Sequence, residues 1–321
     1  MRGTPKLAIV AALAVAAFGA APGAAGAASK ACNGSTKLCS KTLDKVVLPG
    51  SHNAMSSRDI GWGIPNHDIS MAKQLRAGIR AMLIDTHYGV PKLVDFGPSL
   101  GGVRTIIDDA SASTPGASTY LCHSSCLYGA TPLAQGLKTV ADFLAANPRE
   151  VMVFVVEDYL SPADFAAAVT ASGLGSYVYK GSVTRWPTLK SMIDSKQRVV
   201  MLSEGSTGTV SWYRSAYTGA MQETPYSFVS ASLLTTSTSL AASCVPNRGA
   251  RVGGLFLMNH FVTRANGISY ADDSKLVNTK TAIVNRARAC QTARGKLPTI
   301  LAVNNVEFGS VVSAAKSLNG V

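Results

Sequence analysis

Two histidines and three oxygen-bearing side chains stand where buried strands of this sequence are expected to end. They follow or close four apolar runs: His52 and Asn53 after 46–50, Asp85 at the end of 80–85, His123 at the end of 120–123, and Glu157 at the end of 151–157. In a barrel of parallel strands, these strand ends meet at one mouth. Two histidines there can act as base and acid. The oxygen ligands of Asn53, Asp85 and Glu157 suit a hard cation such as Ca²⁺.

Such a set suits the cleavage of a phosphodiester by an internal hydroxyl group. One histidine removes the hydroxyl proton, the other protonates the leaving oxygen, and a cation offsets the charge that develops at phosphorus. His87 lies two residues beyond Asp85. Because strand side chains alternate, it shares the face of Asp85, and we take it as a candidate substrate-binding residue. For His67 and His260 we expect surface or structural roles.

The elements that must hold these residues alternate between strands and helices. Further strands are expected at 198–202, 226–229, 254–259 and 299–303, and helices at 70–77, 133–146, 162–172, 186–195, 274–290 and 310–318. Strands separated by helices pair in parallel through crossovers. About eight strands in roughly 290 residues match a (β/α)₈ barrel. An open doubly wound sheet is the alternative, but it would need a glycine-rich phosphate loop, which Pro49-Gly50-Ser51-His52 is not.

The first 28 residues have the order typical of a secretory signal peptide. Arg2 and Lys6 precede an apolar run over 7–18 and small residues over 20–28. That apolar run is shorter than the ~20 residues of a membrane-spanning helix. The sequence therefore predicts a secreted, extracellular protein in which 29–321 form one barrel domain.

The chain is strongly basic, with a formal net charge of +12. Such a surface attracts polyanions, including anionic lipid headgroups. The basic residues are scattered, and no basic cluster is interleaved with aromatic residues as in nucleic-acid-binding proteins. We therefore expect an anionic membrane surface as partner, no nucleic acid, and a monomer.

The six cysteines are an even number in a chain expected to be exported, which favours disulfides. Two pairs are close in sequence, and this favours Cys32–Cys39 and Cys122–Cys126. Cys244–Cys290 then follows by elimination. A zinc site at 122–126 is disfavoured because no second pair of ligands stands nearby.

Several short motifs, in this order and spacing, resemble the X-domain of phosphatidylinositol-specific phospholipase C. They are Gly50-Ser51-His52-Asn53, the run 78–85, Leu121-Cys122-His123 and the run 148–157. The similarity is clearest from about 46 to 202. Trp186-Pro187-Thr188-Leu189 and Asn259-His260-Phe261 look like later landmarks of the secreted members.

The resemblance implies a distorted (β/α)₈ barrel that cleaves inositol phospholipids into diacylglycerol and 1,2-cyclic inositol phosphate. By motif position, His52 is the general base and His123 the general acid. Calcium-dependent members hold the metal with residues that Asn53, Asp85 and Glu157 match, and metal-free members carry an Arg at the position of Asp85.

One departure from the family pattern is Leu83, which stands where calcium-dependent members have a further acid. The expected Ca²⁺ is therefore weakly held. Two other functions stay open: cleavage of another phosphodiester lipid, and a catalytically eroded, secreted lipid-binding barrel.

Overall fold

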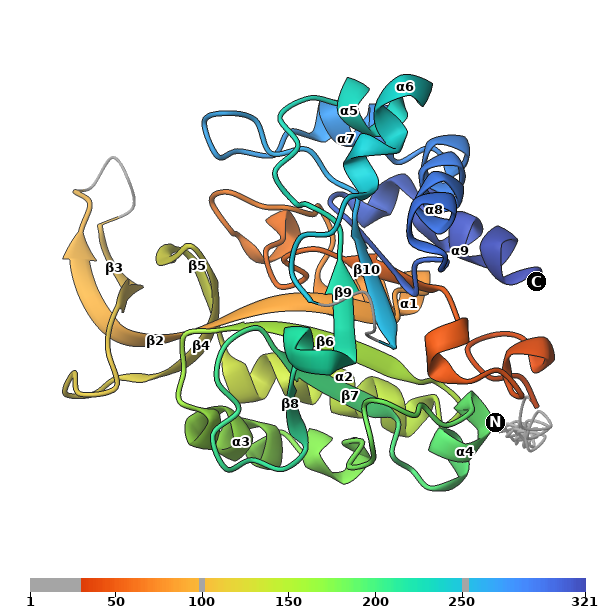
Figure 1. Ribbon diagram of the computed structural model, residues 1–321. Coiled ribbons are helices and arrows are strands. Elements are labelled where there is room, and N and C mark those ends of the chain that lie inside the picture. Colours follow the sequence, from red (N-terminus) through yellow and green to blue (C-terminus); the bar gives the residue numbers. More distant parts are fainter. Residues whose placement is uncertain (1–29, 98–101, 250–253) are drawn as a thin grey trace, which may run out of the picture.

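The computed structural model describes residues 30–97, 102–249 and 254–321 (Figure 1). The expected signal peptide, 1–28, lies outside these ranges. The strands are β1 (Leu48–Ser51), β2 (Ala81–Asp95), β3 (Val103–Asp109), β4 (Ser118–His123), β5 (Ser125–Pro132), β6 (Met152–Asp158), β7 (Val199–Ser203), β8 (Tyr213–Ser215), β9 (Met221–Glu223), β10 (Leu255–Asn259) and β11 (Ile300–Val303). The α-helices are α1 (Met71–Ala77), α2 (Leu133–Ala146), α3 (Pro162–Ala171), α4 (Leu189–Asp194), α5 (Ser232–Thr235), α6 (Ser237–Leu240), α7 (Ala271–Val277), α8 (Lys280–Arg294) and α9 (Ser310–Asn319).

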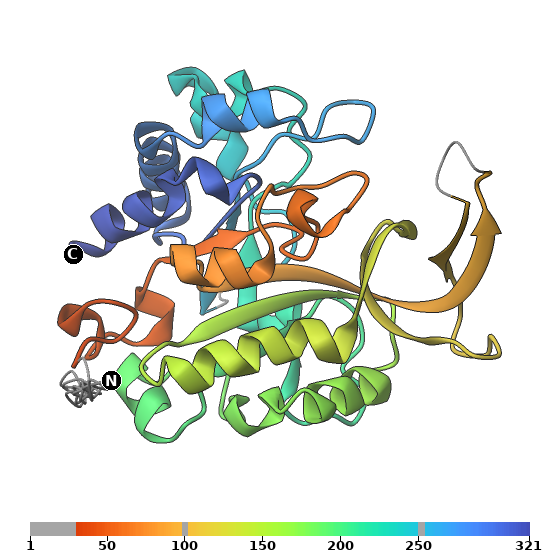
Figure 2. The same ribbon diagram turned by 180° about the vertical axis from the view of Figure 1, so that it is seen from behind.

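Eight parallel strands form the body of the sheet, in the order β8-β7-β6-β2-β1-β11-β10-β9. This is the chain order wrapped around a barrel, with the helices outside it (Figures 1 and 2). Among the residues that the structure describes, no ladder joins β8 to β9, so the barrel is open along this seam. The expected distorted (β/α)₈ barrel is confirmed, and the doubly wound alternative is excluded.

Two of the expected barrel strands were wrong. The run 120–123 is β4, which pairs antiparallel with β2 and β5 instead of joining the parallel barrel. The strand β4 belongs to an antiparallel arm. It forms because β2, which is 15 residues long, extends beyond the barrel and also pairs with β3 (Figure 1). The run 226–229 forms no strand, and β8 and β9 take the two barrel positions instead. Each is only three residues long, too short to show a hydrophobic period.

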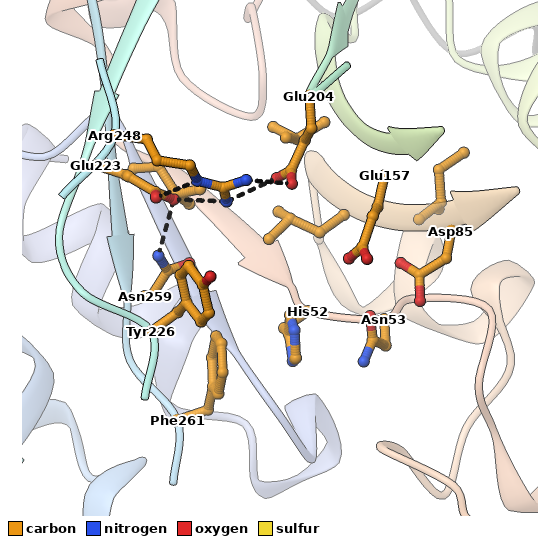
Figure 3. Close-up of a pocket in the computed structure, with 14 residues that line it drawn as sticks. His52, Asn53, Asp85, Glu157, Glu204, Glu223, Tyr226, Arg248, Asn259 and Phe261 are labelled. Carbon is orange, nitrogen blue, oxygen red and sulfur yellow. Dashed lines mark hydrogen bonds and ion pairs between the residues drawn. The ribbon is translucent and has the colours of Figure 1, made fainter. Parts of the chain in front are cut away.

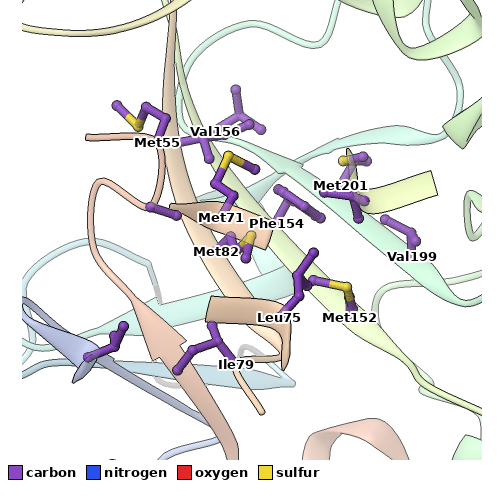
Figure 4. Close-up of a cluster of buried hydrophobic side chains, with 14 of the residues drawn as sticks. Met55, Met71, Leu75, Ile79, Met82, Met152, Phe154, Val156, Val199 and Met201 are labelled. Atoms are coloured by element: carbon purple, nitrogen blue, oxygen red, sulfur yellow. The ribbon is translucent and has the colours of Figure 1, made fainter. Parts of the chain in front are cut away.

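Alternation along the strands separates two apolar layers. Met82 and Ile84 join the layer between strands and helices, which Figure 4 shows together with Leu75 of α1. Leu83 joins the layer inside the barrel, with residues such as Val155 of the neighbouring β6. Because side chains on one strand alternate between the two layers, Leu83 and Asp85 must share the inner face.

The helix ends follow local signals. Gly78 ends α1 with a left-handed φ of 104°, and α2 has the predicted bounds. The single helix expected over 274–290 is two helices, α7 and α8. The Thr279 side chain accepts a hydrogen bond from the Ala282 N–H and so begins a new helix. On the helix-facing side, Arg80 Nε forms an ion pair with Glu150 Oε2 at 2.6 Å.

All three predicted disulfides are present: Cys32–Cys39, Cys122–Cys126 and Cys244–Cys290. They are compatible with an oxidising compartment. Within the described ranges, none of the helices has the length and apolar character needed to cross a bilayer.

Candidate active site

Two adjoining cavities lie at the ends of the barrel strands. They measure about 170 Å³ and about 300 Å³ and share six lining residues: His52, Asn53, Asp85, Glu157, Tyr226 and Phe261. The smaller cavity extends to Glu204, Glu223 and Arg248, and the larger one extends to His123 and Tyr159. The larger cavity thus brings together the two histidines and the three oxygen-bearing side chains that the sequence singled out. Figure 3 shows His52, Asn53, Asp85 and Glu157 in the smaller cavity.

His52 is held by the turn that follows β1. Its backbone N–H donates to Val303 O at 3.0 Å, and Asn53 takes a left-handed φ of 50°, which turns the chain away from the strand. The imidazole stacks on Phe261, with ring centroids 3.8 Å apart. Its Nδ1 lies 3.0 Å from Asn304 Oδ1, an acceptor, so Nδ1 carries the proton and Nε2 keeps a free lone pair.

Burial lowers the pKa of His52 to about 3, against the opposing effect of the Asn304 hydrogen bond. The neutral imidazole is therefore the stable form at neutral pH. His67 supports it from behind: its Nε2 lies 2.8 Å from the His52 carbonyl oxygen, and its Nδ1 accepts from the Val306 N–H at 3.4 Å. His67 is structural, as expected, but it positions the candidate base.

His123 stands at the end of β4, where the register with β5 shifts. The Cys122–Cys126 disulfide closes the turn around it, and Asp109 accepts hydrogen bonds from Ser125 Oγ and the Cys126 N–H, both at 2.7 Å. Burial lowers the pKa of His123, while the charge of Glu157 raises it. Both the arm strand β3 and the disulfide therefore hold this turn in place.

One wall of the site carries Asn53, Asp85 and Glu157. Burial, and then the charges of Glu157 and Glu204, raise the pKa of Asp85 well above its usual range. The Tyr159 hydroxyl donates to Glu157, whereas none of the described residues hydrogen-bonds to the Asp85 carboxylate. We call Asn53, Asp85 and Glu157 the open wall, because no Lys or Arg of the described ranges forms an ion pair with its carboxylates (Figure 3).

Leu83 also lines the smaller cavity. The described residues contain no cluster of three or more His, Cys, Asp or Glu side chains that could bind a metal. The open wall itself offers two carboxylates and one amide oxygen. Oxygen groups of this kind could hold a hard cation whose remaining ligands are water molecules.

The opposite wall carries two more carboxylates and a guanidinium, which the sequence analysis missed. Arg248 Nη1 lies 2.6 Å from Glu204 Oε2, and Arg248 Nε lies 2.6 Å from Glu223 Oε1. The Tyr217 hydroxyl lies 3.1 Å from Glu204 Oε1 and 3.0 Å from Glu223 Oε2. We call Glu204, Arg248 and Glu223 the paired wall (Figure 3).

His87, the candidate substrate-binding residue, lines neither cavity. Its ring stacks on that of Tyr159 at 4.4 Å, so Tyr159 stands at the cavity where His87 was expected. His260 is structural: its Nε2 lies 2.8 Å from Val277 O, and its Nδ1 lies 3.2 Å from Arg286 Nη1. The Asp158 carboxylate accepts hydrogen bonds from Ser203 Oγ and the Gly205 N–H, and Asp158 lines neither cavity.

Comparison with known proteins gives one family. The family model of the PI-PLC X domain matches residues 101–319. The match begins after β1 and the whole of β2, and it extends well beyond 202, where the clear motifs end. No curated protein matches the chain. The matched range covers more than half of the chain, so the protein belongs to the PI-PLC X-domain family, whose members' chemistry points to a phospholipase C-like phosphodiesterase.

Proposed function

We propose that this protein is a secreted phospholipase C that cleaves inositol phospholipids into diacylglycerol and 1,2-cyclic inositol phosphate. The observation that carries the proposal is the placement of His52 and His123 on one cavity, beside carboxylates that could hold a cation. Membership of the PI-PLC X-domain family supports the same reaction class.

His52 is the general base and His123 the general acid. The free Nε2 of neutral His52 takes the proton of the inositol 2-hydroxyl, whose oxygen attacks the adjacent phosphorus in line. Protonated His123 gives its proton to the departing diacylglycerol oxygen. Because the nucleophile belongs to the substrate, the attack is unimolecular, which can offset roughly 7–11 kcal/mol of the barrier.

His123 must be protonated for its role although burial lowers its pKa. The neighbouring Glu157 acts in the opposite direction, and a bound phosphodiester adds a second negative charge near the ring. Base and acid thus have different surroundings, one stacked on Phe261 and the other beside a carboxylate. That difference supports the assignment of the two roles.

The open wall would hold the Ca²⁺, through the side-chain oxygens of Asn53, Asp85 and Glu157. When bound, this ion supplies positive charge for the phosphorus centre. The observation that favours it is the buried Asp85 carboxylate, which is close to the charge of Glu157 and has no Lys or Arg partner in the described part of the chain. Leu83 occupies the remaining part of this wall, so binding should be weak.

The membrane surface is the proposed partner. Tyr159 and Tyr226, which line the larger cavity, are 56% and 45% exposed, and Val229 nearby in sequence is 54% exposed. Aromatic rings with one polar end are suited to a lipid–water interface. Together with the net charge of +12, they would bring the cavity mouth to an anionic bilayer.

The test is the release of water-soluble inositol phosphate from phosphatidylinositol vesicles. We expect His52→Ala and His123→Ala each to lose roughly 10²–10⁴-fold in kcat, because each removes one proton-transfer group. Thermal unfolding and vesicle co-sedimentation should stay close to wild type. A 2-deoxy-inositol lipid should bind without reacting.

Near-wild-type turnover of either variant would refute the two-histidine mechanism. Cleavage of the 2-deoxy lipid would show that water is the nucleophile. If vesicles bind and no lipid is cleaved, the protein is a lipid-binding barrel.

A further inference from the structure

We infer that the end of the barrel opposite the mouth is a docking surface for a linear, phosphate-bearing polymer that has no bases. The basic residues are scattered along the sequence, but the fold gathers a group of them at this end. Docking there needs none of the residues of the proposed reaction. It would hold the protein on such a polymer while the mouth stays open to lipid.

Two adjoining cavities lie at this end of the barrel. They measure about 290 Å³ and about 400 Å³ and share Val46 and Val47, which directly precede β1. Many of their other lining residues also stand just before barrel strands, in 76–80 before β2 and in 296–299 before β11. Figures 1 and 2 show this end, where α9 and the N-terminal segment 30–47 lie away from the arm of β2 and β3.

The charge at this end is the reverse of the charge at the mouth. Among the described residues that line these two cavities, two are acidic, Asp44 and Glu150, and six are basic: Lys41, Lys45, Arg76, Arg80, Lys296 and Lys316. Val321 also lines one of them, and its carboxylate, counted as a third acid, leaves the cations in excess. At the mouth, four carboxylates and one guanidinium line the two cavities. The two ends of the barrel therefore attract ligands of opposite charge.

Much of this positive charge is not neutralised by the protein. Arg80 is the exception, because its Nε lies 2.6 Å from Glu150 Oε2 and its Nη1 donates to two backbone carbonyl oxygens. Arg76 and Lys316 are exposed, and within the described ranges their side chains form no hydrogen bond and no ion pair. These two cations are available to a ligand.

The larger of these cavities holds three ammonium groups and one carboxylate. Lys45 Nζ lies 3.8 Å from Asp44 Oδ2, and the Lys45 side chain is 68% exposed. Burial lowers the pKa of Lys296, and the charge of Lys45 lowers it as well, whereas Asp44 raises it. Lys41 donates to the uncharged Asn319 carbonyl at 2.9 Å. An anion that entered this cavity would therefore relieve the repulsion between the ammonium groups.

We call Lys41, Lys45, Arg76, Lys296 and Lys316 the basic patch, and its composition favours a phosphate polymer. Lysine is a compact charge that binds phosphate without a fixed orientation. None of the described residues that line the two cavities is aromatic. Single-stranded nucleic acids stack their bases on aromatic rings, and aromatic residues are typical of lipid interfaces. Because the patch extends over two cavities, a chain of phosphates contacts more of it than a single ion does.

The test measures the binding of inorganic polyphosphate by calorimetry at physiological ionic strength. The patch variant, Lys45→Gln/Arg76→Gln/Lys316→Gln, removes three exposed charges, so thermal unfolding should stay close to wild type. We expect its Kd for polyphosphate to rise roughly 100-fold, because each basic group near an anionic surface contributes about fivefold.

The matched control is Lys92→Gln/Lys138→Gln/Lys275→Gln, which makes the same change in net charge on the arm, α2 and α7. These lysine side chains are 58%, 62% and 60% exposed. The control's Kd for polyphosphate should stay within about threefold of wild type, because charges far from the patch are screened by salt. Release of inositol phosphate from phosphatidylinositol vesicles should be the same in the two variants, since none of the six residues lines the mouth.

Absence of polyphosphate binding by wild type, or an equal loss in the two variants, would overturn the inference. Tighter binding of single-stranded DNA than of polyphosphate with the same number of phosphates would assign the patch to nucleic acid instead. A loss of phosphatidylserine-vesicle binding confined to the patch variant would assign it to a bilayer. Failure of wild type to cleave lipid would contradict the proposed function alone, and polyphosphate binding would still decide this inference.

Discussion

The two walls of the cavity each carry two carboxylates, but only one wall carries its own cation. On the paired wall, Arg248 lies between Glu204 and Glu223. On the open wall, Asp85 and Glu157 have no basic partner among the described side chains, and the pKa of Asp85 rises as a result of burial and of neighbouring carboxylates. The same residue types therefore have different consequences: one pair is neutralised within the fold, and the other needs a proton or an ion from solution.

The location of the paired wall explains why it is neutralised internally. Glu204 follows β7, Tyr217 lies in the turn between β8 and β9, and Glu223 ends β9. These elements flank the seam where no β8–β9 ladder forms in the described chain. The Arg248 cluster thus links the two sides of the open seam. The open wall lies on strands joined by continuous ladders, so it is free to serve a ligand.

Removing the guanidinium is the strongest test of this difference. Arg248→Met should destabilise the protein by about 3 kcal/mol, because it leaves two buried or nearly buried carboxylates without a counter-charge. Chemical denaturation at pH 7 measures the loss. The matched control is Arg58→Met, which removes an exposed partner of Asp68 and should cost less than about 1 kcal/mol. Equal effects of the two substitutions would contradict a seam-linking role of Arg248.

Removing a charge from the open wall should stabilise the protein in EDTA, whereas removing one from the paired wall destabilises it. The folded-state pKa of Asp85 is raised, so wild type in EDTA should lose stability as the pH rises from about 4 through that pKa. Asp85→Asn has no such loss and should be more stable than wild type at pH 8 in EDTA. Subtracting the two pH profiles removes the contribution of the buried histidines, which both proteins share.

Calcium should make wild type more stable than Asp85→Asn. At 100 times its Kd, the ion would stabilise wild type by about 2.7 kcal/mol and should leave Asp85→Asn nearly unchanged. Differential scanning calorimetry with and without Ca²⁺ measures both effects. An identical Ca²⁺ shift in the two proteins would place the ion elsewhere.

The sequence analysis succeeded where a signal was local. The strands that carry Asp85 and Glu157 are long apolar runs, and α2 has a clear helical period with an Asn-Pro end. Polar residues that follow a barrel strand lie at its mouth, and this reasoning located His52. It applies equally to Glu204 and Asn304, which follow β7 and β11 but belong to none of the motifs that resemble the family.

The rest of the site depends on tertiary structure. Glu223 lies on a three-residue strand, and Arg248 comes from a loop within a region, 205–250, that shows no regular period. Arg248 reaches Glu204 across 44 positions in the chain, and nothing in either residue's neighbours indicates the pairing. The antiparallel arm that holds His123 was missed for a related reason, since strand direction is set by long-range pairing.

The smallest expected effect concerns Leu83, the residue that separates the open wall from the family's calcium pattern. It lines the smaller cavity two positions before Asp85 on the same face of β2, and it is 8% exposed. Leu83→Asp would add a third carboxylate to the donor set, and we expect it to tighten Ca²⁺ binding about tenfold, or about 1.4 kcal/mol. The same change should lower the melting temperature in EDTA, because it adds a further buried negative charge beside Asp85.

Leu83→Asn is the matched control: it makes the same change in size without the charge and should tighten Ca²⁺ binding much less. Calorimetric Ca²⁺ titration of the three proteins decides the matter, and unchanged or weaker binding by Leu83→Asp would mean that the open wall is not the calcium site.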